Sequence, residues 1–557
     1  MLKMLVCGIM LFLFSLLMMM MSLYLMLINK CFFLEWLIYS INSMKFNFYV
    51  LIDYKSLMFI FLVSNIFSMI IIYSISYMSL DELMMNRFFY LMILFLASMY
   101  LLILSPNMLS IILGWDGLGL ISYCLVIYYM KMKSFSSGMV TIILNRVGDS
   151  GLLMMMCFVT CFGSWNLILY KMDKFMMFFL LMMAFTKSAQ MPFSTWLPMA
   201  MMAPTPVSSL VHSSTLVTAG IYLLIRYVDL LNIEFKNIIL FVSSLTMLFA
   251  GLVANFELDL KKIVAYSTLS QLGFMMSMVS LGFSDLVFLH LFIHAMFKSL
   301  MFMCVGSFMH YMNSVQDLRM YYGMFYIYPL KSMILMFSML SLCGFPFLVG
   351  FYSKDLIIEY FFYSPMNYFS LINLILSTML TVSYTFRIIL VLTSNFLKLN
   401  IIFSKEDDIM GITMLIMMIL SLIYSKLMFN LMNFSLYGVN LILIYKFMIL
   451  KMLMLGLVMG YNFYKFNLLN NSIGSFFMMF LNMNFIYKKI YLGLLMYMFG
   501  YEIEFEKMFI ESFSGKFMSL LMNLYNIKIK NLMINTLLLT MIYLISLMIF
   551  MINYYIN

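Results

Sequence analysis

Charged side chains are scarce in this sequence. Only 10% of its 557 residues are Asp, Glu, Lys or Arg, whereas 65% are hydrophobic and the mean hydropathy is +1.05. Soluble domains carry about 25% charged residues, so this chain has too few to cover a soluble surface. Its hydrophobicity equally excludes intrinsic disorder. The composition therefore predicts a polytopic membrane protein.

Clustered cysteines and clustered basic residues are also missing. The seven cysteines form no Cys-x-x-Cys pair, which is the usual spacing of zinc and iron–sulfur ligands. The net charge is +10, but pairs such as Lys131/Lys133 and Lys261/Lys262 lie at the ends of apolar runs. That placement is typical of interfacial anchors and not of a nucleic-acid-binding stripe. We predict no redox centre, no metal or cofactor site and no nucleic-acid partner in this chain.

Long apolar runs are abundant. About 20 apolar residues are needed for a helix to cross the hydrocarbon core, and about fifteen such runs can be delimited. They lie at 4–28, 56–78, 88–105, 108–130, 139–162, 175–199, 205–227, 237–255, 263–283, 285–309, 330–351, 370–397, 409–428, 435–463 and 532–554, with a weaker run at 473–486. Lipid offers the backbone no water, so each run is expected to be a helix. The predicted fold class is all-α.

One segment breaks the apolar pattern. Residues 487–531 mix Lys and Glu with apolar side chains that recur at helical spacing from Met508 to Leu520. This predicts an amphipathic helix lying along the membrane surface, with a solvated loop as the alternative. The run at 532–554 would anchor its far end.

Ionisable residues inside the apolar runs are the main clue to function. A charge at mid-bilayer costs about 2.5–3.5 kcal/mol on insertion scales, and such residues usually face a hydrated interior. The alternatives are static ion pairs, satisfied core histidines and lysines that reach the interface. The candidates are Asp116, Arg146, Asp149, Lys187, His212, His290, His294, Lys298, Lys354 and Asp355.

Spacing groups several of these candidates. Arg146 and Asp149 are three residues apart and share a helix face. His290, His294 and Lys298 are four residues apart in turn, so they line one stripe of a helix. A proton wire explains these buried histidines better than packing does. A metal pair would need a third ligand that the pattern does not supply.

Lys187 and Lys354 each lie next to a predicted helix break. The breaks are at Pro192 and Pro198 in the first case and at Gly344 and Pro346 in the second. Proline kinks or ends a helix, and broken helices at membrane depth line cavities. The two lysines occupy comparable places in residues 88–227 and 237–397, which predicts two structural repeats of five helices each.

Several motifs together resemble one family, the chain 5 family of mitochondrial NADH–ubiquinone oxidoreductase (respiratory complex I). The resemblance covers residues 50–400 in order. The motifs are TKSAQ at 186–190, PTPVS at 204–208, HSST at 212–215, DLKKIVAYST at 259–268, SQLG at 270–273 and GFYSKD at 350–355.

The resemblance implies an antiporter-like subunit that translocates protons across the mitochondrial inner membrane, as part of the H⁺-translocating NADH:ubiquinone reductase. The resemblance implies that the two five-helix repeats are inverted relative to each other and that each forms a half-channel. NADH, FMN, iron–sulfur clusters and ubiquinone would then bind to other subunits. The implied partners are other complex I subunits, especially neighbouring antiporter-like ones that the surface helix would clamp, and membrane lipid.

The resemblance also implies roles for the candidate residues. Lys187 would be the central lysine of the first half-channel, with Asp116 as its acidic partner. His212 and the stripe on 285–309 would form a horizontal relay to Lys354 and Asp355, while Arg146 and Asp149 would influence the first lysine. The family usually has Glu where this chain has Asp116. The shorter side chain predicts that the pair with Lys187 needs a water bridge or a helix shift.

Two other functions fit part of the pattern, namely the large subunit of a sodium/proton antiporter and a structural scaffold of the membrane arm. The 70 Met, 57 Phe and 38 Tyr residues indicate an AT-rich organelle genome, which favours complex I. On this reading residues 1–28 are a first span and not an import signal. The predicted segments are 1–87 (first spans), 88–227 and 237–397 (repeats), 405–486 (additional spans), 487–531 (surface helix) and 532–557 (anchor).

Overall fold

The structure is a computed structural model. It describes residues 2–41, 44–78, 82–167, 170, 172–364, 367–394, 406–432 and 443–465, with isolated pieces at 493, 519, 522–523 and 544–549. The chain divides into two units, Met1–Leu481 and Asn482–Asn557. Apart from the isolated pieces, the predicted surface helix at 487–531 and the anchor at 532–557 lie outside the described residues.

Helices dominate the described part of the chain, as the apolar runs predict. Twelve of the described helical segments are long and apolar enough to cross a membrane. They are α1 (Leu2–Ile28), α2 (Tyr54–Met78), α3 (Glu82–Leu104), α4 (Met108–Val126), α5 (Met132–Thr160), α10 (Ile233–Phe256), α11 (Leu260–Leu281), α12 (Ser284–Tyr311), α16 (Tyr368–Thr393), α17 (Asp408–Leu431), α18 (Leu443–Lys465) and the composite segment Thr205–Leu230. The other three predicted runs are 175–199 and 330–351, which are broken, and 532–554.

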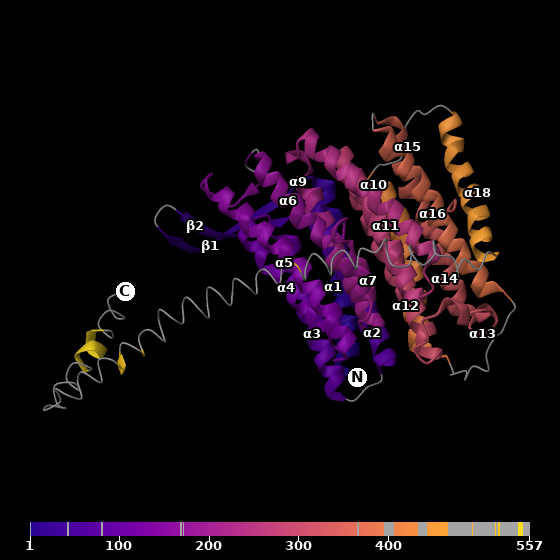
Figure 1. Cartoon of the computed structure of the whole chain (residues 1–557), viewed down its shortest axis with the longest axis horizontal. Coiled ribbons are helices and arrows are strands. Elements are labelled where there is room, and N and C mark those ends of the chain that lie inside the picture. The colour runs from indigo at the N-terminus through magenta and orange to yellow at the C-terminus, as the bar shows by residue number, and fades with distance from the viewer. Residues whose placement is uncertain are drawn as a thin grey trace. The chain divides into compact units, whose positions relative to one another are not determined.

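A β-hairpin adds to the predicted helical architecture. Strands β1 (Phe32–Ile41) and β2 (Met44–Ile52) pair antiparallel, with a register irregularity between Leu37 and Tyr39. Their aromatic and β-branched residues favour strands. The hairpin lies between the predicted runs 4–28 and 56–78, and its own apolar stretches are too short to predict a spanning helix. Figure 1 shows the hairpin projecting sideways from the helices.

Both predicted helix breaks are present in the structure. Helix α6 (Lys174–Lys187) ends at Lys187, and a turn with a cis Met191–Pro192 peptide leads to η2 (Phe193–Thr195) and α7 (Trp196–Ala200). Helix α14 (Pro329–Cys343) ends at Gly344, whose φ of +82° is the left-handed conformation that glycine adopts easily. Helix α15 (Phe351–Tyr363) follows.

A third irregularity was not predicted from the sequence. Between α8 (Thr205–Val207) and α9 (Leu216–Tyr227), the segment η3 (Ser208–Thr215) is a π-helix that contains His212. Such wide turns occur frequently at functional sites. The serines and threonines in this segment bond to carbonyls in the preceding turn, for example Thr215 to Leu210, which accommodates the extra residue.

The centre of the first unit is built from α11, α12 and the composite segment that contains η3, which are almost wholly buried. Helix α12 contacts η3, α11, α14, α17 and α2. Figure 1 shows α11 and α12 between the helices that precede them and α14, α16 and α18. Candidate residues on η3 and α12 therefore lie in the middle of the bundle. The inverted relation of the two repeats and the predicted segment boundaries stay predictions.

Candidate functional site

Lys187 is the last residue of α6 and has no exposed surface. Its Nζ donates a hydrogen bond to the Trp115 carbonyl of α4 (3.2 Å) and lies 5.0 Å from the centre of the Trp115 ring. A Cβ on Gly119 would lie 3.4 Å from this nitrogen, so the glycine leaves room for the ammonium group. This burial argues against a lysine that reaches the interface.

The carboxylates near Lys187 are held by Arg146. Nη1 of Arg146 lies 3.5 Å from a carboxylate oxygen of Asp116 and 3.5 Å from one of Asp149. Among the described residues no carboxylate oxygen lies within 4.0 Å of Lys187 Nζ. Asp116 therefore contacts Arg146 and not Lys187, the partner that the resemblance implies for it.

Close helix packing brings Asp149 towards Lys187. A Cβ on Gly148 would lie 2.1 Å from the Thr186 hydroxyl, so only glycine lets α5 approach α6 at this level. Asp149 is buried, whereas the Asp116 and Arg146 side chains are 38% and 49% exposed. The first site therefore has an inner acid, Asp149, and an outer pair at the edge of this chain.

His212 is buried in the π-helix η3, with its ring centre 6.1 Å from that of Trp196. Neither ring nitrogen has a hydrogen-bond partner within the described part of the chain. Buried polar atoms are normally paired with protein groups or with ordered water. The imidazole is therefore suited to bonding with water inside the bundle.

Lys261 corrects the prediction of an interfacial anchor. It is only 4% exposed and donates a hydrogen bond to the Ala203 carbonyl, just before α8. Lys262 instead pairs with Asp259 (2.5 Å) near the helix start. Adjacent helix residues point about 100° apart, so neighbouring lysines on a packed helix have different surroundings, and this signal was available in the sequence.

The predicted stripe on α12 is buried along its length. His290 Nδ1 lies 2.8 Å from the Ser353 hydroxyl, and its Nε2 lies 3.3 Å from the Gln271 side-chain oxygen. The ring centres of His290 and His294 are 6.4 Å apart. Helices α11 and α15 thus supply Gln271 and Ser353 as polar partners of His290. Both residues belong to motifs of the family resemblance, but the sequence did not predict this contact.

The other two members of the stripe differ in their partners. Lys298 donates to the hydroxyl of Ser267, which lies on α11 one turn from Gln271. Neither ring nitrogen of His294 has a partner in the described residues. Like His212, it offers two unpaired nitrogens inside a buried polar layer.

Lys354 occupies the second helix break. Its Nζ donates to the carbonyls of Leu342 and Cys343 (both 3.3 Å) and to the Thr381 hydroxyl (3.0 Å). These carbonyls are free because α14 ends there, and a helix C-terminus carries partial negative charge that favours a cation. The break therefore provides the acceptors that hold this buried ammonium.

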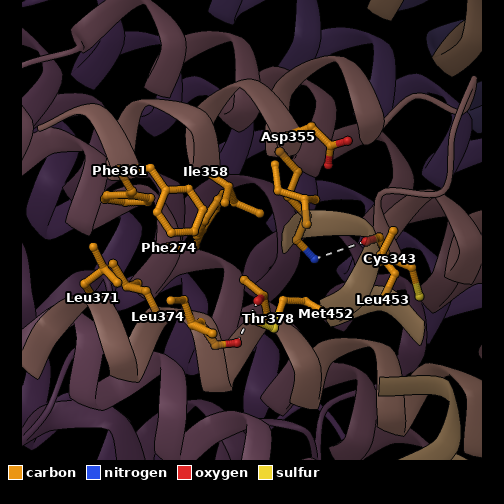
Figure 2. Close-up of a pocket in the computed structure, with 14 residues that line it drawn as sticks. Phe274, Cys343, Asp355, Ile358, Phe361, Leu371, Leu374, Thr378, Met452 and Leu453 are labelled. Atoms are coloured by element: carbon orange, nitrogen blue, oxygen red, sulfur yellow. Dashed lines mark hydrogen bonds between the residues drawn. The ribbon is translucent and has the colours of Figure 1, made fainter. Parts of the chain in front are cut away.

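Lys354 lines a small pocket between α11, α14, α15, α16 and α18. Figure 2 shows apolar side chains such as Phe274, Phe361 and Leu374 on one side of it, with Asp355 and Cys343 on the other. Asp355 follows Lys354 in α15 but forms no ion pair with it in the described structure. The second site is thus a lysine at the polar end of an otherwise apolar space.

Comparison with known proteins identifies the family. Residues 36–89 match the family described as NADH-ubiquinone oxidoreductase (complex I), chain 5 N-terminus, and residues 105–381 match NADH:quinone oxidoreductase/Mrp antiporter, transmembrane. Over 554 residues, the chain is 74% identical to NADH-ubiquinone oxidoreductase chain 5 of Apis mellifera ligustica, and the match covers all of both chains. The chain belongs to the NADH–ubiquinone oxidoreductase chain 5 family. It is therefore a multi-pass subunit of the mitochondrial inner membrane.

Further comparisons agree with membership of the chain 5 family. The chain 5 protein of Locusta migratoria is 55% identical over 299 residues, which is 52% of each chain. Among solved structures, the Mrp complex from Dietzia sp. DQ12-45-1b matches with a TM-score of 0.71 and 22% identity, over 86% of this chain and 56% of that one. A membrane-bound sulfane sulfur reductase matches with a TM-score of 0.66 and 18% identity, over 79% and 94%. These structures share the fold, whereas the sequence relatives favour complex I over the sodium/proton antiporter alternative.

Proposed function

We propose that this chain carries protons across the membrane along a buried line that runs from Lys187 through His212 and the α12 stripe to Lys354. The observation that carries the proposal is that all of these titratable groups are buried. They lie on α6, η3, α12 and α15, and η3, α11 and α12 pack against one another in the middle of the bundle. Burying so many ionisable groups in a membrane is costly, and proton transfer gives them a use.

Arg146 gives the first site two arrangements. In this structure it holds Asp116 and Asp149, and Lys187 is bonded only to a carbonyl and an aromatic ring. When a carboxylate reaches the ammonium, the charged form is stabilised, and when the carboxylate is withdrawn, desolvation favours loss of the proton. A pair 4 Å apart is worth about 4 kcal/mol at an effective dielectric near 20. That energy changes the ratio of protonated to deprotonated Lys187 by roughly several hundredfold.

Water is needed between the fixed groups. The ring nitrogens of His212 and His294 have no partner among the described residues, and the rings of His290 and His294 are too far apart for a direct hydrogen bond. Buried water typically bonds to such unsatisfied groups. Protons would pass along these waters, while redox chemistry with NADH, FMN, iron–sulfur clusters and ubiquinone takes place in other subunits.

The exposed side of the first site indicates where a neighbour binds. Asp116 and Arg146 lie within membrane-spanning helices yet are partly exposed. Charges facing hydrocarbon are costly, so a neighbouring antiporter-like subunit of complex I would cover this pair.

The test is Lys187→Met in intact complex I, with the number of protons pumped per NADH oxidised as the readout. We expect a lower ratio, because methionine cannot carry the proton. The matched control is Lys174→Met on the same helix, whose side chain is 68% exposed and pairs with Glu234 at the surface. An undiminished ratio in Lys187→Met would contradict the proposal. A scaffold role would instead reduce the amount of assembled complex and leave the ratio of the remainder unchanged.

A further inference from the structure

A second group of buried polar side chains lies where α2, α8 and α12 meet, away from the line described above. Tyr73 of α2 has no exposed surface, and its hydroxyl donates to the Met303 carbonyl of α12 (3.1 Å). Thr205, the first residue of α8, is 2% exposed, and its Oγ1 has no hydrogen bond of good geometry in the described part of the chain. A buried hydroxyl in this state is a site for water.

These hydroxyls converge on one glycine. A Cβ on Gly306 of α12 would lie 2.7 Å from the Tyr73 hydroxyl and 2.7 Å from Thr205 Oγ1. The Tyr77 hydroxyl also lies beside Thr205. Glycine at 306 therefore lets three hydroxyl groups from two other helical elements meet at α12.

The group extends to one face of the membrane. The Tyr77 ring stacks on Tyr73 with centres 5.7 Å apart, and its centre lies 5.5 Å from that of His310. Tyr77 and His310 are half-buried and lie at the ends of α2 and α12, and Nδ1 of His310 has no partner among the described residues. The same two helices begin at the opposite face, where Lys55 pairs with Asp285 (2.6 Å) next to the hairpin.

The group also extends towards His212. Ser208 and Ser209 lie between Thr205 and His212 in the chain, at the start of the π-helix η3. Both serines are fully buried, and their hydroxyls donate to the carbonyls of Thr205 and Pro206. The short segment that joins Thr205 to the unpaired ring of His212 is therefore buried and rich in hydroxyl groups.

We propose that Tyr73, Tyr77, Thr205 and His310 form a hydroxyl-lined branch that carries protons between His212 and the membrane face opposite the hairpin. The branch rests on the proposed function of the central line. At each transfer an O–H or N–H bond forms on the acceptor as one breaks on the donor, so one proton moves and no electron does. His310 exchanges the proton at the membrane face, water beside Thr205 Oγ1 relays it, and His212 exchanges it with the central line.

The test compares Thr205→Val with Thr205→Ser in intact complex I. Valine keeps the shape of threonine but removes the hydroxyl, and serine keeps the hydroxyl. We expect Thr205→Val to lower the protons pumped per NADH as much as Lys187→Met does, and Thr205→Ser to keep the normal ratio. The control is Tyr227→Phe, which removes a buried hydroxyl that bonds to the Pro106 carbonyl at the hairpin face.

The outcomes separate the two proposals. A normal ratio in Lys187→Met overturns the proposed function and the branch with it. If Lys187→Met lowers the number of protons pumped per NADH but Thr205→Val does not, the branch alone is overturned. The branch is also overturned if Thr205→Ser lowers the number as much as Thr205→Val does. If Thr205→Val does not assemble, the double variant Tyr73→Phe/Tyr77→Phe decides in its place, and a normal ratio there overturns the branch.

Discussion

At the scale of single residues, the two buried lysines are held mainly by backbone carbonyls. Lys187 bonds to the Trp115 carbonyl, and Lys354 bonds to the two carbonyls at the end of α14. Carbonyl dipoles stabilise an ammonium less than a nearby carboxylate does, so these lysines can release a proton when the acids are kept away. At the first site, both acids lie beside Arg146, and neither forms an ion pair with Lys187 in the described residues.

Replacing Arg146 tests this arrangement. In Arg146→Gln, Asp149 loses its cation and is free to pair with Lys187, so the ammonium is stabilised and its release of the proton slows. We expect proton pumping to fall several-fold while the complex still assembles, measured as protons per NADH in sealed membranes.

The control for this prediction is Arg319→Gln, because Arg319 pairs with Asp317 at an exposed site. Equal pumping by Arg146→Gln and the unmodified complex would show that the arginine does not govern Lys187.

At the scale of secondary-structure elements, a largely buried ion pair joins the segment after the hairpin to the bundle. Asp53, in the connection between β2 and α2, receives two hydrogen bonds from the guanidinium of Arg226 on α9, and both side chains are 17% exposed. Burial alone would raise the pKa of Asp53, but the bonds and charge of Arg226 outweigh burial and lower the pKa below its ordinary value of 3.8. The connection that follows the hairpin is thus fixed to α9 by charge.

The stability contributed by this pair depends on pH in a defined direction. Because folding lowers the pKa of Asp53, the contribution is complete above pH 3.8 and is lost as the pH falls below that value. Asp53→Asn leaves the largely buried Arg226 without its counter-charge. Breaking a fully buried pair costs about 3–5 kcal/mol, and the cost here is lower because both side chains are 17% exposed. We expect thermal unfolding of the variant at lower temperature near pH 7, and a difference from the unmodified protein that shrinks below pH 3.8. A difference that is constant with pH would rule out this ion pair as the cause.

A second arginine caps a helix. Arg387 of α16 is buried and donates to the carbonyls of Asn255 and Glu257 at the C-terminal end of α10. Those carbonyls have no partner within their own helix. The contact therefore satisfies them and fixes α10 against α16.

Arg387→Met should destabilise this contact without touching the candidate site. Each hydrogen bond to a charged group contributes about 1.5–3 kcal/mol, so we expect markedly less assembled complex and a normal ratio of protons per NADH in what assembles. A lowered ratio would instead place Arg387 in the proton path.

The elements also show what could be predicted from the sequence. The spans follow from run length, and the breaks follow from Pro192 and Gly344, because bilayer thickness and backbone sterics act locally. The hairpin was missed because a short aromatic segment between two spans has no helix-length signal. The π-helix around His212 was missed because one extra residue per turn leaves no mark on composition.

The hydrogen-bond partners of the site residues could not be predicted from the sequence, for a different reason. Ser267 and Ser353 approach α12 from separate helices, and the Trp115 carbonyl has no side-chain signal at all. Such contacts depend on how distant segments pack, which a single sequence does not encode visibly. Lys261 is the exception, since its position beside Lys262 already placed the two on different faces.

At the scale of the whole molecule, we propose that protons pass in series through Lys187, His212, the α12 stripe and Lys354. The chain belongs to the chain 5 family, and in the structure these side chains are all buried, on α6, η3, α12 and α15. Groups in series behave as a unit when they are removed, whereas independent groups have additive effects.

The most direct measurement compares Lys187→Met, Lys298→Met and the double variant by the number of protons pumped per NADH in intact complex I. Lys298 lies on α12 and Lys187 on α6, and both are fully buried. The account predicts that each single variant lowers the ratio by the same amount and that the double variant lowers it no further. Losses that add in the double variant would mean two separate paths, and a normal ratio in either single variant would place that lysine outside the path.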